Sequence, residues 1–551
     1  MSFTEFFQIT NIHFIFALCI AIVNAVLLVL IARKFLQILQ LSGYKVRGYK
    51  IWLSDTKAKY ISRLALLCFL SLACVLVTNA LFDVYNQDML FSYLGLIFYV
   101  YFSIVFVLNM DRSPQKTPLV QTRRMSRIMT LLFFISFVIT LILIWASTLI
   151  LPFLRYGIVA ITPILLPVLV PLAHFILVPL ELMIRRMYIK KAKAKLEKRA
   201  DLIKIGITGS YGKTSVKHIL NVMLSQKYNV CMTPHSFNTP MGLTKVVLKY
   251  LKDENQVLIA EMGAKQVGEI KFLCDLIKPN HAIITGIGNQ HLQYFGSEEN
   301  ILKTKNELVL SLEKKSNVVF NITSVGGKTL FEDCQLQNKF AVELSTASDV
   351  QAENVSITPR GLVFDMVYNG EKVACNSKLL GKHNLLNILT AASLALKLGV
   401  SLVQIKTALE TLEPISHRLE LIQNNNITIL DDAFSSNEQG AISALEVLGQ
   451  FDGKVKICVT PGIVELGAAE KEVNTNLGKL LAGVCDYVVI VNKLNAEAIK
   501  EGLLTSQMQT ENIIQVDTLE DAKVKLQEIF ENEKNKEYVV LFENDLPDNY
   551  T

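Results

Sequence analysis

A glycine-containing loop between a predicted strand and a predicted helix has the residue types that hold phosphate. The apolar stretch 202–207 predicts a buried strand, and an apolar helical pattern runs through Leu224. Glycines let the backbone curve around a phosphate, amides at the helix start face its charge, and a lysine reaches the terminal phosphates. We therefore predict ATP binding by Thr208, Gly209, Ser210, Tyr211, Gly212, Lys213, Thr214 and Ser215.

The loop departs from the general phosphate-loop pattern at one position. The pattern G-x-x-x-x-G-K-[ST] requires glycine at 207, where this chain has Ile207. The order of strand, loop and helix is nevertheless the one that phosphate binding needs. A chance glycine loop is the alternative interpretation, so the assignment depends on further motifs.

The loop resembles that of the Mur ligases and their relatives, the folylpolyglutamate, cyanophycin and poly-γ-glutamate synthetases. Further blocks follow in the family's order, and the resemblance covers residues 202 to about 545. The blocks are Ser-Phe-Asn-Thr-Pro-Met-Gly at 236–242, Val-Leu-Ile-Ala-Glu-Met-Gly at 257–263, a histidine-containing segment at 283–297, Gly-Lys-His-Asn-Leu-Leu-Asn at 381–387 and Ser-His-Arg-Leu-Glu at 416–420. The resemblance implies an ATP-dependent ligase that joins an amine to a carboxylate through an acyl phosphate.

The resemblance also implies a set of magnesium ligands. Glu261 stands where the family keeps a carboxylate for Mg²⁺, and with the Thr214 hydroxyl it would supply the oxygen ligands that this hard cation requires. His291 matches a histidine that binds a second Mg²⁺, and Lys305 matches a lysine that is carbamylated in several members and then ligates Mg²⁺. Taken alone, His291 would be a surface residue and Lys305 a solvated helical lysine. Gly286 replaces the family's usual asparagine.

The remaining blocks imply a nucleotide clamp. His383, Asn384 and Asn387 match the block that opens a helix near the adenine. Arg418 matches an arginine from the last domain that reaches the nucleotide, and a permanently charged planar fork suits phosphate. Asp432 would bind the ribose or the γ-phosphate side. We expect ATP and Mg²⁺ as cofactors.

The candidate substrate residues lie in two places. Ser236, Asn238 and Thr239 belong to the loop that resembles the family's substrate-side loop, and Asn437 and Glu465 lie in the last domain. The Asp-Asp, Asn and Glu-Leu-Gly positions here resemble the branch of the family that adds D-alanyl-D-alanine. Differences at 433–436 and 460–464 leave another amine, such as a single amino acid, open.

Three side chains are the candidate catalytic residues: Lys213, His291 and Lys305. Charge stabilisation and positioning dominate phosphoryl transfer, so a lysine and bound Mg²⁺ would act on the transferring group. We find no obvious dedicated base in the sequence, and we expect positioning to supply most of the rate.

An α/β architecture would position these residues, because short apolar strands alternate with helical patterns after residue 201. We predict a Mur-ligase central domain with a P-loop ATPase site at 201–415 and a C-terminal Rossmann-like domain at 416–551. The two domains should close on ATP, since the candidate ligands come from both.

The first 180 residues predict a transmembrane helix bundle. The mean hydropathy of +0.36 and the 19% charged residues are too apolar for an ordinary soluble protein, and the excess is confined to 1–180. A bilayer core of about 30 Å needs about 20 apolar residues in a helix. Five stretches qualify: approximately 12–32, 61–82, 90–108, 128–151 and 157–180.

Loop charges predict the orientation of the bundle. Lysine and arginine are abundant at 33–63, at 112–127 and at 185–199, and absent from 83–89. By the positive-inside rule the basic loops are cytoplasmic, so the N-terminus faces outside and the catalytic domains are cytoplasmic. The segment 181–200 predicts a basic juxtamembrane helix on anionic headgroups. Prolines at 163, 167 and 171 predict a kink or break in the last span.

The predicted partners follow from both halves. They are a cell-wall precursor or other carboxylate substrate, an amino acid or dipeptide that supplies the amine, and membrane lipid. We do not expect nucleic acid as a partner, because the net charge of +6 is small and most of the basic surplus lies beside apolar segments. In peptidoglycan Mur ligases a UDP-binding domain precedes the phosphate loop, where this chain has the apolar region. We therefore expect the bundle or the membrane surface to present the carboxyl substrate.

Other functions stay open. One is a ligase that makes a poly-amino-acid or modifies a lipid-linked acceptor. Another is a membrane transport ATPase, which the uncharged spans and the single nucleotide motif disfavour. A third is an inactive scaffold, which is disfavoured because Lys213, Thr214, Glu261 and His291 are all present.

Overall fold

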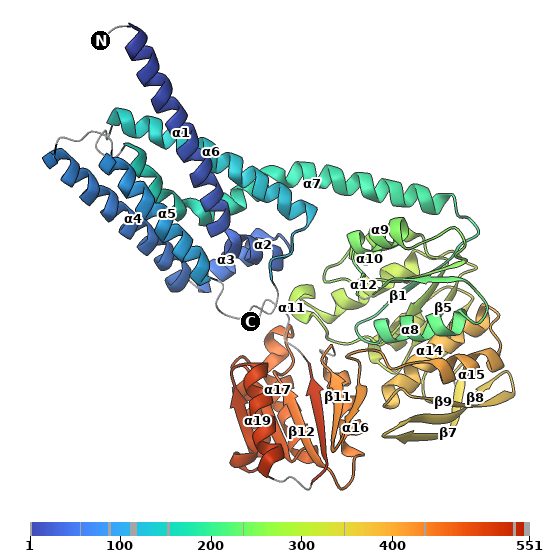
Figure 1. The fold of residues 1–551 in the computed structure, drawn as a ribbon. Helices are drawn as coiled ribbons and strands as arrows, with labels where there is room; N and C mark the ends of the chain where they lie inside the picture. Colours follow the sequence, from blue (N-terminus) through green and yellow to red (C-terminus); the bar gives the residue numbers. More distant parts are fainter. Residues whose placement is uncertain are drawn as a thin grey trace. The chain divides into compact units, whose positions relative to one another are not determined.

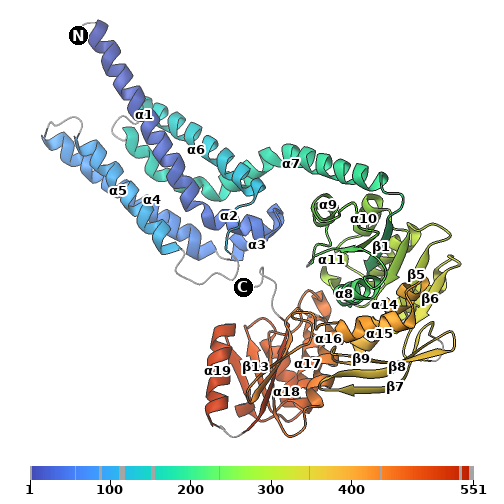
Figure 2. The same cartoon turned by 45° about the vertical axis from the view of Figure 1, so that its right-hand side comes forward.

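The computed structural model describes residues 3–55, 57–85, 90–110, 118–150, 155–234, 236–345, 348–434, 437–532 and 536–544. The chain forms two compact units, one of residues 1–185 and the other of residues 186–546. Figure 1 and Figure 2 show helices throughout the first unit and layered sheets and helices in the second. Each unit is described by itself.

The first unit is helical. Within the described ranges, four segments are long and apolar enough to cross a membrane, namely Phe14–Ile31, Tyr60–Ala80, Arg123–Ser147 and Tyr156–Glu197, and Leu94–Asn109 is a shorter apolar helix. All five coincide in position with the predicted stretches. The elements are α1 (Phe3–Ile31), α2 (Arg33–Leu41), α3 (Val46–Asp55), α4 (Lys57–Tyr85), α5 (Leu90–Met110), α6 (Arg123–Ile150), the 3₁₀ helix η1 (Arg155–Leu165) and α7 (Leu166–Glu197).

The last predicted span is broken, as its prolines predict. The 3₁₀ helix η1 contains Pro163 and gives way to the α-helix α7 at Leu166. Proline lacks a backbone N–H and clashes with the preceding turn, so a change of helix type at this point is expected. Pro171 lies inside α7 without ending it. The basic segment predicted as a helix at 181–200 is the last part of α7, which ends at Glu197.

Polar side chains hold the interior of the bundle together. The Asn24 amide donates to Thr140 Oγ1 at 2.8 Å and to Thr162 Oγ1 at 3.1 Å, and the Tyr99 hydroxyl donates to Asn24 Oδ1 at 2.6 Å. These residues come from α1, α6, η1 and α5, and all four are buried. Lipid offers helices little hydrophobic drive to associate, so such hydrogen bonds help to fix their register.

The second unit begins with a six-stranded parallel sheet in the order β2-β3-β1-β4-β5-β6. Near-continuous apolar strands such as Val257–Glu261 are typical of a parallel sheet covered on both faces. Its strands are β1 (Ile203–Thr208), β2 (Val230–Met232), β3 (Val257–Glu261), β4 (His281–Ile284), β5 (Asn317–Asn321) and β6 (Lys339–Val342). The helices are α8 (Lys213–Leu224), α9 (Pro240–Lys249), α10 (Glu269–Ile277), α11 (Leu292–Phe295), α12 (Glu298–Leu310) and α13 (Val325–Asp333).

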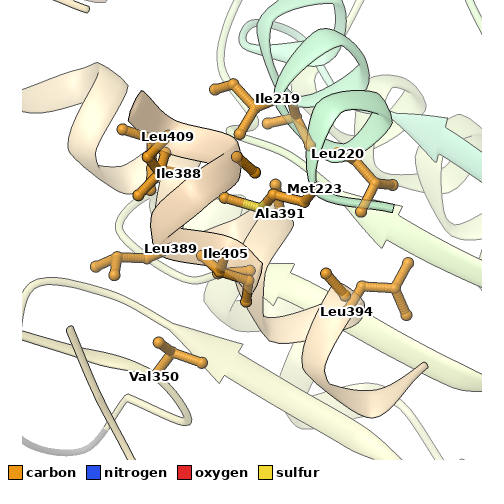
Figure 3. Packing of buried hydrophobic residues seen from close by; sticks show 14 of the residues in the cluster. Ile219, Leu220, Met223, Val350, Ile388, Leu389, Ala391, Leu394, Ile405 and Leu409 are labelled. Atoms are coloured by element: carbon orange, nitrogen blue, oxygen red, sulfur yellow. The ribbon is translucent and has the colours of Figure 1, made fainter. Parts of the chain in front are cut away.

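An antiparallel sheet and two helices complete this domain. The sheet has the order β7-β8-β9, with β7 (Gln351–Thr358), β8 (Gly361–Tyr368) and β9 (Glu371–Ser377). Helices α14 (Lys382–Lys397) and α15 (Leu402–Thr411) follow. Figure 3 shows Ile388 and Ala391 of α14 packed toward Ile219 and Met223 of α8, and all four are buried. The core therefore ties α14 to the helix that carries the phosphate loop.

The last residues of α7 belong to the core of the second unit. Ala192 and Leu196 are buried in the cluster that covers the other face of the parallel sheet. The Lys195 ammonium donates to the carbonyl of Leu251 at 2.5 Å, and Arg199 donates to that of Asn255 at 2.5 Å. The C-terminal end of α7 is thus an integral part of the second unit.

The C-terminal domain is a second α/β domain with a sheet of its own. Its sheet has the order β10-β11-β15-β12-β13-β14, in which only β10 runs antiparallel to its neighbour. The strands are β10 (Glu420–Asn424), β11 (Ile427–Asp432), β12 (Val455–Thr460), β13 (Tyr487–Val491), β14 (Ile513–Val516) and β15 (Tyr538–Glu543). The helices are α16 (Glu438–Gly449), η2 (Gly467–Ala469), α17 (Glu470–Val484), α18 (Ala496–Thr505), η3 (Thr510–Asn512) and α19 (Leu519–Asn532). The predicted α/β fold class is confirmed.

Candidate active site

The phosphate loop connects β1 to α8, and glycines shape it. Gly212 has a φ of 81°, which favours glycine, and it stands directly before the first residue of α8. The amides of Ser210 and Tyr211 donate to the carbonyl of Gly286 at 2.8 and 3.2 Å. The amides of the first turn of α8 have no intrahelical acceptor, which makes them the natural donors to a phosphate.

The unusual glycine at 286 has a structural explanation. A Cβ atom at this position would overlap the ring of Tyr211, so a side chain at 286 cannot coexist with the tyrosine in this conformation. The Thr285 hydroxyl also donates to the carbonyl of Tyr211 at 2.6 Å. The departure from the family pattern at Gly286 therefore accompanies a tyrosine in the phosphate loop.

Lys213 lies folded over its own loop. Its ammonium donates to the carbonyls of Gly209 and Ser210 at 2.7 and 2.8 Å. Burial lowers the pKa of Lys213 to about 8, although Glu261 opposes the shift, and Arg418 adds to it. The lysine is thus close to a carboxylate of its own domain and to an arginine of the C-terminal domain.

Glu261, the last residue of β3, is the most heavily bonded carboxylate of the site. Its Oε2 accepts from Thr214 Oγ1 at 3.1 Å and from Lys217 Nζ at 3.0 Å, and its Oε1 accepts from Asn238 Nδ2 at 3.2 Å. Burial would raise the pKa of Glu261, but Lys217 and Lys213 together lower it below the ordinary value. Glu261 is therefore an anion at neutral pH.

Lys217 was not among the residues predicted from the sequence. Its side chain is fully buried and forms an ion pair with Glu261, whose side chain is 2% exposed. The available signal was its spacing, because a residue four positions after Lys213 lies on the same face of α8. A lysine on a helix face that is otherwise apolar calls for a buried counter-charge.

Thr214 and Glu261 are suited to magnesium. Their oxygens lie 3.1 Å apart beside the phosphate loop, and Mg²⁺ is commonly held by one or two protein oxygens, phosphate and water. Among the described residues no group of three His, Cys, Asp or Glu side chains could hold a metal ion by itself. The donor set therefore fits a cation that the nucleotide phosphates help to bind.

His291 and Glu465 connect the two domains of the second unit. His291 Nδ1 hydrogen-bonds to Glu465 Oε2, and Lys265 Nζ donates to Glu465 Oε1 at 3.1 Å. Burial would raise the pKa of Glu465, but His291 and Lys265 hold it at about 2, and burial lowers the pKa of His291. A neutral His291 that donates from Nδ1 leaves Nε2 available as a ligand, in the manner of carboxylate-oriented metal histidines.

Lys305 is buried in α12, and burial lowers its pKa to about 7, with a contribution from Lys213. Its ammonium lies 5.6 Å from the centre of the Phe295 ring. A substantial fraction of this amine is neutral at neutral pH, and the neutral amine is the form that reacts with CO₂. The environment thus suits the carbamylation that the resemblance implies.

The block at the start of α14 lies against the phosphate loop. A Cβ at Gly212 would come within 2.8 Å of Asn387 Oδ1, and Asn387 Nδ2 donates to Asn384 Oδ1 at 3.1 Å. Burial lowers the pKa of His383 to about 4, so this histidine is neutral, and its Nδ1 has no hydrogen-bond partner among the described residues. Asn387 therefore lies beside the phosphate loop, and Asn384 lies next to Asn387.

Arg418 and Asp432 approach the same place from the C-terminal domain. Arg418 interacts electrostatically with Asp432 and Glu261, and Asp432 Oδ1 accepts from the amide of Leu419 at 3.0 Å. Asp432 is also the register partner of Glu543 on β15. Burial and the neighbouring Asp432 raise the pKa of Glu543 well above its ordinary value, so this missed residue is protonated.

Several predicted site residues have structural tasks. Thr239 is the N-cap of α9 and accepts from Gly242 N, and Asn437 is the N-cap of α16 and accepts from Gly440 N. The Thr208 hydroxyl is buried and donates to the carbonyl of Met262 at 3.0 Å. Ser236 is exposed, whereas Asn238 lies on Glu261. The substrate role of Ser236, Thr239 and Asn437 stays a prediction.

The Mur ligase middle domain family matches residues 207–395, the part that holds the phosphate loop, Glu261, His291 and Lys305. Residues 207–395 are a Mur ligase middle domain. The chain is also similar to UDP-N-acetylmuramoyl-tripeptide–D-alanyl-D-alanine ligases. That of Bacillus subtilis is 29% identical over 57% of this chain and 67% of its own length, that of Haemophilus influenzae 28% over 52% and 62%, and that of Escherichia coli 29% over 52% and 64%. This chain thus spans about two thirds, or somewhat less, of these relatives.

Solved structures of Mur ligases also superpose on this chain. MurF from Acinetobacter baumannii superposes with a TM-score of 0.60 and 26% identity over 66% of this chain and 77% of that one. MurF ligase from Thermotoga maritima, solved in complex with ADP, superposes with a TM-score of 0.57 and 25% identity over 66% of this chain and 80% of that one. The Mur ligase middle domain therefore sits in a catalytic unit with the Mur-ligase α/β fold.

The buried ion pair of the middle domain generates a prediction. Lys217→Met leaves Glu261 as an uncompensated buried charge, which costs about 3–5 kcal/mol, so the melting temperature of the purified protein falls clearly. Lys217→Met combined with Glu261→Gln removes both charges and recovers most of the loss, as calorimetry of the parent protein and the two variants would measure. A single variant as stable as the parent protein would refute the pairing.

Proposed function

We propose that this chain is an ATP-dependent carboxylate–amine ligase of the Mur type that acts on a cell-wall precursor at the cytoplasmic face of a membrane. One observation carries the proposal: Lys213, Glu261 and Arg418, from two domains, act on one another around the phosphate loop. A site that gathers a phosphate-binding loop, an anionic oxygen ligand and an arginine from a second domain is built for phosphoryl transfer. The similarity to UDP-N-acetylmuramoyl-tripeptide–D-alanyl-D-alanine ligases supports the same reaction class.

The proposed reaction has two steps. The carboxylate of the precursor attacks the γ-phosphorus atom of ATP, and the bond between this atom and the oxygen that bridges to the β-phosphate breaks. The products of this step are an acyl phosphate and ADP. The amine then attacks the acyl carbon, phosphate leaves, an amide bond forms, and the amine proton passes to solvent. Lys213 exchanges its loop carbonyls for phosphate oxygens, and the first amides of α8 stabilise the charge on the transferring group.

Magnesium would be held by Thr214 and Glu261, with His291 and a carbamylated Lys305 at a second position. Bound there, it would neutralise phosphate charge during transfer. Glu465 orients His291 through Nδ1, and Asn238 and Lys217 fix the carboxylate of Glu261. Arg418 would reach the phosphates and Asp432 the ribose or γ-phosphate side, with His383, Asn384 and Asn387 near the adenine.

The substrates are proposed from the relatives' names. A UDP-N-acetylmuramoyl-tripeptide would supply the carboxylate and D-alanyl-D-alanine the amine, and a single amino acid is the alternative amine. Ser236 and Asn238 would face the carboxyl substrate, whereas Asn437 and Glu465 lie in the domain that would receive the amine.

Replacing Lys213 should remove ligation without unfolding the protein. Lys213→Ala deletes the point charge that stabilises the transferring phosphoryl group, so turnover should fall by about 10²–10³-fold or more. The measurement is ADP release that depends on both the muramoyl peptide and D-alanyl-D-alanine. Lys265→Ala, which removes a lysine from Glu465 instead, is the matched control and should lose less. Near-normal turnover in Lys213→Ala would contradict the assignment.

Lys305 should carry a carbamate in the working enzyme. Its pKa of about 7 means that acidification below pH 7 protonates the amine and drives carbamate loss, so added bicarbonate should restore activity most at low pH. Lys305→Arg keeps the positive charge of the unmodified, protonated lysine but cannot be carbamylated, and it should lose both activity and the bicarbonate response. Lys303→Arg, at an exposed position in the same helix, should lose neither. Bicarbonate-independent activity across the pH range would refute the carbamate.

Removing the helical unit should impair substrate presentation. A fragment that begins at Arg186 retains the part of α7 that packs into the catalytic unit, so it should still bind ATP as the full chain does. We expect its ligation rate to be more than tenfold lower with a membrane-presented carboxyl substrate. If the fragment ligates a soluble UDP-linked peptide as fast as the full chain, the helical unit is only an anchor.

The proposed location is the cell membrane, with five spans, the N-terminus outside and the catalytic unit in the cytoplasm. In a cysteine-free variant, a single cysteine at Thr4 should react with an impermeant maleimide added to intact cells, and one at the exposed Ser506 should react only after lysis. The opposite labelling pattern would overturn the orientation. Labelling of both positions in intact cells would also overturn it.

A further inference from the structure

Arginine and histidine side chains meet where α6 begins in the helical unit. Arg124 and Arg127 lie in the first turns of α6, and His174 and Arg185 lie on α7. Tyr44, in the turn after α2, lies between Arg124 and His174. The Arg124 guanidinium is 3.8 Å from the centre of the Tyr44 ring, and the His174 ring is 6.0 Å from it.

Two nitrogen atoms in this cluster are buried without a hydrogen-bond partner among the described residues. They are Arg124 Nε and His174 Nδ1, and the His174 side chain is 96% buried, since its exposed fraction is 4%. A buried polar nitrogen that stays unbonded costs free energy comparable to a lost hydrogen bond. Two such nitrogens beside the same tyrosine indicate that a ligand supplies their hydrogen-bond partners.

The charge of the cluster indicates an anion. The charged groups that act on Arg124 are Glu181, Arg127 and Arg185. Glu181 is already paired with Arg127 at 2.6 Å. With Arg124 included, three arginines face one glutamate, which leaves a surplus of positive charge. The planar fork of an arginine, held by stacking on Tyr44, matches the oxygens of a phosphate group.

The position along the helices indicates where that anion comes from. Both helices continue from the cluster as apolar segments, Arg123–Ser147 and Tyr156–Glu197. Tyr60 begins the apolar segment Tyr60–Ala80, and its ring contacts that of Trp52. Aromatic side chains at the ends of apolar helices are typical of the level of lipid headgroups.

We infer that Arg124, His174 and Tyr44, with Arg127 and Arg185 around them, form a binding site for the phosphate group of a membrane lipid. The site goes beyond the proposed ligase reaction, and it needs only that the bundle lies in a membrane. Arg124 would donate through its fork and His174 Nδ1 would hydrogen-bond to the phosphate group, while the lipid chains would lie along α6 and α7. Free phosphate shares this chemistry and is distinguished by the test.

The test measures lipid retention by the full-length protein without ATP or substrate. Protein purified in a neutral detergent is mixed with phosphatidic acid or with phosphatidylcholine, and bound lipids are counted by native mass spectrometry. We expect selective retention of phosphatidic acid. Arg124→Gln and His174→Gln should each weaken it about tenfold, the effect of losing one hydrogen bond to a charged group.

The matched control is Arg123→Gln, which removes the same charge from an exposed neighbour in the same helix turn. Equal losses in Arg123→Gln and Arg124→Gln would reduce the effect to general surface charge and overturn the site. Unchanged retention in both Arg124→Gln and His174→Gln would also overturn it.

Two further measurements use proteins that keep the charge. Arg124→Lys retains the charge but not the stacked fork, and it should retain less phosphatidic acid than the parent protein. In the unmodified protein, millimolar inorganic phosphate should displace little lipid, because it lacks the chains. Full displacement would make the site one for a soluble anion and would overturn the lipid assignment.

Discussion

The catalytic unit depends on one buried carboxylate. Glu261 ends a strand that is covered on both faces, and an anion there is tolerable only because Lys217, Thr214 and Asn238 all reach it. Lys217 and Thr214 come from α8, so the same contacts that neutralise the carboxylate also fix the helix that carries the phosphate loop. The core between α8 and α14 then places Asn387 beside Gly212. The electrostatics of one side chain and the packing of two helices thus give the loop its shape.

The C-terminal domain takes part in the site through charged side chains. Glu465 accepts from Lys265 and is bonded to His291, and Arg418 acts on Glu261 and Lys213. Because these contacts are polar and involve few groups, nucleotide and magnesium can compete for them. Such an arrangement is suited to domains that open and close on a ligand.

Much of the fold and the phosphate loop could be predicted from the sequence because their signals are local. The strands Ile427–Asp432 and Tyr538–Glu543 and the break before Leu166 follow from periodicity and proline. The spacing of Lys217 from Lys213 was a local signal, but its importance comes from Glu261, which lies 44 residues away along the chain. Glu543 gave no such signal, because its importance comes from Asp432 on an adjacent strand. Thr239 and Asn437 illustrate the converse, because a residue directly before a helix often caps it.

The contact between Tyr211 and Gly286 has an evolutionary consequence. The two positions are 75 apart in the sequence, yet the ring of one fills the space that a side chain at the other would need. A lineage that acquires a side chain at 286 must turn the tyrosine ring away from its present place or exchange it for a smaller residue. The two positions are therefore expected to change together rather than independently.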